Sequence, residues 1–161
     1  MFQVFMFSQT SEYALRVIVY LAGSNGRPVT NRHISAGTLV PQGYLAKVLQ
    51  TLSRSGMVKS QRGLHGGTVL AKDPEILTLY DVVQCVDPIR RIESCPLAML
   101  AHGKHLCPLH SRLDEAISGI ETILRNSTIA DLMESRSKHQ PTTLCEPPAP
   151  ATKRTGRRNA R

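Results

Sequence analysis

Apolar residues recur at helical spacing in the first third of the chain and predict three helices. A buried helix is expected from about Ser11 to the Ser-Asn-Gly turn of residues 24–26. A short second helix is expected over residues 31–37, because Thr30 before it is a good N-cap residue. The third helix follows Pro41, which suits a first helical turn, and it carries one apolar stripe, made of Leu45, Val48, Leu49 and Leu52.

A glycine-rich hairpin is expected after the third helix. Gly56 ends that helix, and residues 57–60 and 68–70 have the pattern of two short strands around the loop of residues 61–67. Two helices joined by a short turn and followed by such a hairpin are typical of a winged helix-turn-helix.

The next part of the chain changes character at residue 87. A short helix over residues 79–86, capped by Thr78, closes the predicted winged helix-turn-helix domain of residues 1–86. Residues 87–107 contain prolines, a glycine and cysteines without a clean period. We therefore interpret residues 87–107 as a cysteine-bearing sensor loop.

A second helical pattern begins at Pro108. Apolar residues return at a spacing of three and four, at Leu109, Leu113, Ala116, Ile117, Ile120 and Leu124. A long helix so far from the first domain is a natural dimerisation element, although a plain core helix would show the same pattern. We assign residues 108–136 to a dimerisation helix region and residues 137–161, rich in Pro, Thr and basic residues, to a disordered basic tail. The expected fold class is mainly α, with a winged helix-turn-helix domain and a long C-terminal dimerisation helix.

Charge divides the chain into basic ends and an acidic middle. Residues 1–70 contain seven Lys or Arg against Glu12 alone, a net charge of +6. Residues 71–137 contain seven against ten acids, a net of −3, and residues 138–161 contain six against one, a net of +5. A basic N-terminal part suits a polyanion such as double-stranded DNA. Aromatic residues make up only 4% of the chain, which disfavours a stacking surface for single-stranded nucleic acid.

The start of the third helix carries the residues expected to read DNA. Helix-turn-helix proteins place their second helix in the major groove, with its N-terminal residues against base edges. Gln42 can pair with adenine, and Lys47 can reach guanine or a phosphate. Gly43 permits close approach of the backbone. Tyr44 either donates to a phosphate or lies half-buried against the turn.

Basic residues extend the predicted DNA surface into the hairpin. Arg54 and Lys59 flank it, and Arg62 and His65 project from its loop, where an arginine can enter a narrow minor groove. The loop glycines allow a tight turn and a close approach to the sugar-phosphate chain. A solvated loop with incidental charge is the alternative, whereas a nucleotide-binding loop is disfavoured because its G-x-G-x-x-G spacing is absent.

The chain shows no signal for export or for insertion into a membrane. Residues 1–7 are apolar but lack a basic region and a cleavage site, and no apolar run approaches the ~20 residues that span a bilayer. Four cysteines in 161 residues are too few for a disulfide framework. We expect a cytoplasmic protein with reduced thiols and no membrane partner.

Three stretches of the chain together resemble the Rrf2 family of transcription regulators. They are TSEYALRVIVYLA, LVPQGYLAKVLQTLSRSGMVKSQRGLHGGTVLAKDPEILTLYDVVQCVD and LCPLH. The resemblance covers about residues 6–134 and is specific, because helix, wing and cysteine loop arrive in order. It implies a homodimer on a roughly palindromic operator, in a family that includes iron–sulfur regulators and nitric-oxide-responsive repressors.

The resemblance also implies an iron–sulfur cluster at the cysteine loop. Cluster-binding members commonly carry three cysteines there; Cys95 and Cys107 match the outer two, and Ala101 lies near the place of the middle one. Histidine replaces cysteine in some two-iron clusters. A carboxylate near the start of the first helix is a ligand in some members. We expect Cys95 and Cys107 as ligands first, then one of His102, His105 or His110, with Glu12 as a further candidate.

The sequence therefore predicts a sequence-specific DNA-binding regulator, expected to be a repressor, and not an enzyme. An iron–sulfur cluster, [2Fe–2S] or [4Fe–4S], would gate it in response to redox, nitric oxide or iron–sulfur status. The alternatives are another metal such as tetrahedral zinc, thiol oxidation, and a cofactor-free regulator that responds to a small ligand. Enzymatic use of Cys95 or Cys107 is disfavoured, because no second group is placed to orient a base.

Overall fold

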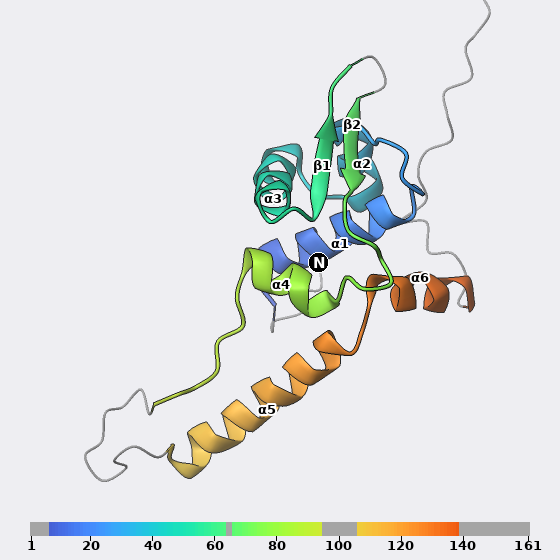
Figure 1. Cartoon of the computed structure of the whole chain (residues 1–161). Helices are drawn as coiled ribbons and strands as arrows, with labels where there is room; N and C mark the ends of the chain where they lie inside the picture. The colour runs from blue at the N-terminus through green and yellow to red at the C-terminus, as the bar shows by residue number, and fades with distance from the viewer. Residues whose placement is uncertain (1–6, 64–65, 95–105, 139–161) are drawn as a thin grey trace, which may run out of the picture.

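The structure is mainly α-helical, with one small antiparallel sheet (Figure 1). The computed structural model describes residues 7–63, 66–94 and 106–138. In chain order the elements are α1 (Gln9–Ala22), α2 (Asn31–Thr38), α3 (Gln42–Arg54), β1 (Val58–Gln61), β2 (Gly67–Leu70), α4 (Leu79–Val86), α5 (Pro108–Arg125) and α6 (Ile129–Lys138). The predicted order of helices and hairpin is confirmed.

Helix α1 is the centre of the core. Ala14, Val17, Ile18 and Leu21 have no exposed surface, and the helix contacts α2, α3, α4, α6 and β2. The helix starts earlier than its sequence pattern suggested, because the Ser8 side chain caps it by accepting a hydrogen bond from the Ser11 backbone N–H at 3.2 Å. Four other helices and strand β2 are thus packed on this one apolar helix.

The turn between α2 and α3 depends on two special backbone positions. Gly37 near the end of α2 lies against the ring of Tyr20, and a Cβ there would come within 2.2 Å of a ring carbon. Leu39 then adopts a left-handed conformation, with φ 57° and ψ 26°. Its side chain is 62% exposed, so burial does not explain why a leucine stands there.

The hairpin is anchored to the body by a third extended segment. In β1 and β2, Val58 pairs with Leu70 and Gln61 with Gly67. Val29 exchanges two backbone hydrogen bonds with Thr68, of 3.0 and 2.8 Å. A Cβ at Gly67 would lie 2.6 Å from the Val29 carbonyl oxygen. This glycine is therefore required for the wing to pair with the segment before α2.

The predicted region of residues 108–136 contains two helices with different surroundings. Helix α5 extends away from the body, whereas α6 returns to it (Figure 1). Ile129 at the start of α6 is fully buried, and its backbone N–H donates to the Leu77 carbonyl oxygen at 2.9 Å. The end of this region therefore belongs to the core that α1 organises.

Replacing Leu39 by asparagine is expected to stabilise the fold. A left-handed conformation costs an L-residue about 1–2 kcal/mol, and asparagine tolerates it better than leucine. We expect Leu39→Asn to raise the free energy of unfolding by about 1 kcal/mol, measured by thermal unfolding. Leu39→Ala is the matched control, because it keeps the strained Cβ and should bring no such gain. Equal melting temperatures for the two variants would contradict a strained turn.

Candidate nucleic-acid interface and sensor region

Helix α3 has one buried and one exposed side. Its buried residues are the predicted stripe of Leu45, Val48, Leu49 and Leu52. The side away from the core exposes Gln42, Gly43, Tyr44, Ala46, Lys47, Gln50, Ser53 and Arg54. Four predicted DNA contacts, Gln42 to Tyr44 and Lys47, thus reach solvent together with Arg54. No Asp or Glu occurs in α3, so this face is basic.

The Tyr44 ring lies between Tyr13 of α1 and the Lys47 ammonium group. Its ring meets the Tyr13 ring edge-on, with centroids 5.9 Å apart and an interplanar angle of 75°. The Lys47 Nζ lies 5.8 Å from the Tyr44 centroid, within the range of a cation–π contact. Tyr44 remains 49% exposed. The ring therefore packs on α1 and still presents a face beside Lys47.

Gly43 has no structural requirement of its own. A Cβ at this helical position would meet nothing within 4 Å. Because alanine is the better helix former, the fold alone does not explain the glycine. The predicted close approach of DNA to Gly43 is compatible with this open space and stays a prediction.

The wing presents basic side chains on a backbone that the turn itself constrains. Lys59 in β1 and Arg62 after it are exposed. Gly63 has φ 114°, and a Cβ at Gly66 would lie 2.5 Å from the Gln61 carbonyl oxygen. The geometry of the turn accounts for Gly63 and Gly66, as predicted, while a close approach of these glycines to the sugar-phosphate chain stays a prediction. His65 lies outside the described residues.

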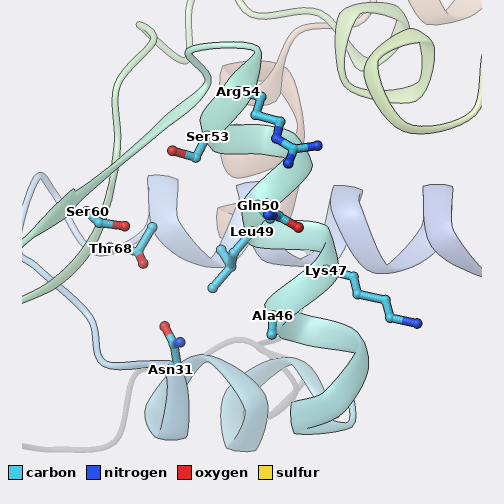
Figure 2. A pocket seen from close by; sticks show the side chains of 9 residues that line it. All are labelled: Asn31, Ala46, Lys47, Leu49, Gln50, Ser53, Arg54, Ser60 and Thr68. Atoms are coloured by element: carbon cyan, nitrogen blue, oxygen red, sulfur yellow. The ribbon is translucent and has the colours of Figure 1, made fainter.

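A hollow lies between α3, the wing strands and the start of α2 (Figure 2). Asn31, Ser53, Ser60 and Thr68 line its inner part, while Lys47 and Arg54 extend on the other side of α3 (Figure 2). Gln50 also lines it. The sequence prediction missed these polar residues. The helical period could have placed Gln50 and Ser53, but only tertiary packing brings Asn31 and Ser60 beside them.

Where the predicted sensor loop meets α5, the described residues contain one close pair of candidate ligands. Cys107 is the N-cap residue of α5, and its Sγ lies 3.1 Å from the His110 Nδ1. The other candidates Cys95, His102 and His105 lie outside the described residues. Glu12 forms an ion pair with Arg16 one turn later in α1. Across residues 7–63, 66–94 and 106–138, no group of three His, Cys, Asp or Glu could hold a metal ion.

The part of the predicted sensor loop that follows α4, residues 87–94, is held against α5. Arg91 donates to Asp114 from Nε at 2.7 Å and from a second guanidinium nitrogen, and the Ile92 backbone N–H donates to the same carboxylate at 2.9 Å. Glu121 lies 3.7 Å from the Arg91 guanidinium. These contacts fix the course of residues 91 and 92 along α5.

Sequence comparison decides the family. Residues 7–135 match the sequence profile of the Rrf2 family, described as an iron-dependent transcriptional regulator. This chain belongs to the Rrf2 family. A protein of Aquifex aeolicus that carries the provisional name HTH-type transcriptional regulator is 33% identical over 137 residues, which cover 83% of this chain and 95% of the relative.

Further similarity is found in a named relative and in a solved structure. The HTH-type transcriptional regulator NsrR of Geobacillus kaustophilus is 31% identical over 133 residues, covering 79% of this chain and 88% of NsrR. The structure of T. potens IscR superposes with a TM-score of 0.67 at 22% identity, covering 81% of this chain and 88% of IscR. These comparisons confirm a winged helix-turn-helix transcriptional regulator, and they confirm that this Rrf2 protein is not an enzyme.

Helix α5 of this Rrf2 protein leaves much of its apolar surface uncovered. Leu109 is 64% and Ile123 66% exposed, and Leu113 is also exposed. Only Leu124 of this helix is buried. Arg125 at its end stacks over the Tyr80 ring of α4, 3.4 Å from the centroid. The described helices include none that is long and apolar enough to cross a membrane.

Removing the Asp114 charge is expected to destabilise the protein in a pH-dependent way. The hydrogen bonds from Arg91 and from the Ile92 backbone lower the pKa of Asp114 from 3.8 to about 2. A folded-state pKa below the unfolded-state value means that the ion pair stabilises the protein above about pH 4 and that this contribution is lost as the pH falls toward 2. In thermal unfolding, Asp114→Asn should melt below wild type at neutral pH, and the difference should vanish in acid.

Glu115 gives the matched control for that experiment. It pairs with Arg112 at 2.7 Å, but both side chains are exposed, and such surface pairs contribute little. Glu115→Gln should therefore follow wild type at every pH. A difference between Asp114→Asn and wild type that stays constant down to pH 2 would argue against the pairing with Arg91.

Proposed function

We propose that this Rrf2 protein is a homodimeric repressor that binds a double-stranded DNA operator through α3 and the wing. The observation that carries the proposal is the exposed side of α3, where Lys47 and Arg54 stand on a helix without acidic residues. Phosphates account for most of the affinity of such a surface, and base contacts for its specificity.

The residues divide between these two tasks. Gln42 at the start of α3 would pair with a base edge, and Gly43 would admit the DNA closely. Tyr44 and Lys47 would contact phosphate or guanine next to it. The remaining proposed contacts are basic and belong to the helix end and the wing, namely Arg54, Lys59, Arg62 and His65.

The dimer is proposed to form through α5. Leu109, Leu113 and Ile123 on this helix are exposed, although the helix extends from a body with a well-buried core (Figure 1). Contiguous exposed apolar surface on a soluble protein commonly marks an interface. The α5 helix of a second protomer would cover this surface. The resulting dimer would present two recognition helices, one α3 from each protomer. Their centres must lie about 34 Å apart to enter successive major grooves on one side of the duplex.

An iron–sulfur cluster, [2Fe–2S] or [4Fe–4S], is proposed as the sensor. Cys107 and His110 fit such a group, because a cysteine sulfur and an imidazole nitrogen, both ligand atoms in iron–sulfur proteins, lie 3.1 Å apart at the start of α5. Cys95, together with His102 or His105, would supply further ligands, and Glu12 is an additional candidate. The cluster would supply a charge and a ligand geometry that change with redox state or nitric oxide. Through the ligands Cys107 and His110 at the start of α5, that change would alter the distance between the two α3 helices of the dimer.

A cofactor-free thiol sensor is the second candidate, and the same pair favours it. Cys107 is partly exposed, and the His110 Nδ1 can accept the thiol proton or donate to the thiolate. Thiolates at helix starts and beside histidines are the reactive ones in proteins. Oxidation at Cys107 would then alter α5 without any metal.

Substitutions in the wing and in the reading helix should affect DNA binding differently. An operator is first selected from a pool of random duplexes. Arg62→Ala should then weaken binding to the operator and to scrambled duplex alike. A plot of the logarithm of the binding constant against the logarithm of the salt concentration should become less steep by about 1. Gln42→Ala should instead change the preferred base at one position, with about 1–3 kcal/mol less discrimination.

Arg90→Ala is the control for Arg62→Ala, because Arg90 is exposed on the segment that follows α4, outside α3 and the wing. It removes the same charge and should leave affinity and salt slope near the wild-type values. Wild-type binding by both Arg62→Ala and Gln42→Ala would show that α3 and the wing are not the DNA-binding surface.

Loading the full chain with iron and sulfide under anaerobic conditions distinguishes the two sensors. A cluster protein should show visible absorbance with bound iron and sulfide. Cys107→Ala should lose this absorbance, and Cys85→Ala, which changes the packed cysteine of α4, should keep it. A colourless wild type whose DNA affinity changes with peroxide only when Cys107 is present would instead establish the thiol sensor. A colourless protein without that response would refute both.

A further inference from the structure

The inner part of the hollow beside α3 is lined by neutral hydrogen-bonding groups. The Asn31 amide and the hydroxyls of Ser53 and Ser60 come from three different elements, α2, α3 and β1 (Figure 2). Asn31, Ser53 and Ser60 are all exposed. Within the described ranges, none of these three side chains has a hydrogen-bond partner. The hollow therefore offers converging polar groups that the fold itself does not use.

The electrostatics of the hollow favour an anion. No carboxylate lines it. Asn31 is the first residue of α2, and the first N–H groups of a helix lack intrahelical partners and carry a partial positive charge. Arg32 in the same turn is exposed as well. Lys47 and Arg54 from α3 also line it, and their side chains extend on the other side of this helix (Figure 2).

The arrangement also matches the path of a DNA strand. When the second helix of the motif lies in the major groove, the first helix crosses the sugar-phosphate backbone. Here the start of α2 meets α3 and β1 at the hollow. A strand bordering the groove that α3 occupies would thus pass over Asn31 and Ser60.

We propose that this hollow seats one phosphate of the operator backbone, with the Asn31 amide and the Ser60 hydroxyl as its hydrogen-bond donors. The inference rests on the proposed DNA-binding function and adds a neutral phosphate contact to it. The seat fixes the register of the protein on the duplex and carries no base preference.

Substitutions at Asn31 test the seat by three readouts. Asn31→Ala removes a hydrogen bond to a charged group, so affinity should fall about tenfold or more, by the same factor on selected and scrambled duplex. The salt dependence of its binding constant should equal that of wild type, because a neutral side chain displaces no counterion from the DNA when it binds a phosphate. Lys47→Ala, by contrast, should make the plot of log binding constant against log salt concentration less steep by about 1.

Asn31→Asp adds a repelling charge without a change of shape. Affinity should fall further than in Asn31→Ala. The melting temperature should be kept or raised, because an acid in the first turn favours a helix. Asn25→Asp makes the same change in the exposed turn after α1 and should leave affinity nearly unchanged.

Three results would refute the proposed phosphate site in the hollow. Wild-type affinity in both Asn31 variants would show that the hollow is not occupied by DNA, while binding by the wild type would leave the proposed function standing. A loss confined to the selected duplex would make Asn31 a base-reading residue. A wild type that binds no duplex would remove both the proposed function and the seat, and the Arg62 experiment would show that first.

Discussion

The burial of α1 is the constraint on which the other elements depend. Its apolar side chains are shared by α2, α3, α4, α6 and β2, and full burial of one large aliphatic side chain stabilises a fold by about 1.5–3 kcal/mol. Since α3 and the wing meet the same helix, their mutual position is set by core packing. A polar substitution at Val17 or Ile18 would therefore disturb the DNA-facing surface without touching it.

The proposed DNA-binding surface combines two kinds of group with different physical properties. Lys47, Arg54 and Arg62 are exposed cations, and the attraction of such charges to phosphate acts over a distance and weakens with salt. Asn31 and Ser60 are neutral, so hydrogen bonds from them to a phosphate would act only at contact and would depend little on salt. Under the proposed function, the cations would attract a duplex to the surface, and the neutral donors would define where its backbone rests.

Helix α5 lies under different constraints from the core helices. It is held to the body at one end, by Arg125 on Tyr80 and by buried Leu124. Along its length it is held by Arg91 on Asp114. Leu109, Leu113 and Ile123 on this helix are exposed in a single chain. Under the proposed function, a change at Cys107 would act on a helix whose position is set by a few polar contacts and by its partner.

Sequence alone determined the elements of this protein and the chemistry available to it. Sequence alone located α3, α4 and α5 along the chain, because helical period and capping are local properties. The signals were the stripe of Leu45 to Leu52, the Thr78 cap and the apolar pattern after Pro108. The family resemblance was equally local, carried by contiguous stretches.

Only tertiary structure decided what those elements do together. That Gly37 accommodates the Tyr20 ring, that Gly67 lies on Val29 and that Asp114 holds Arg91 depends on residues between 17 and 38 positions apart, which no local pattern connects. The same holds for the hollow, since Asn31 and Ser60 meet through the pairing of the wing with Val29. Periodicity assigns a residue to a face of its own element, but the neighbours of that face follow from how the elements pack.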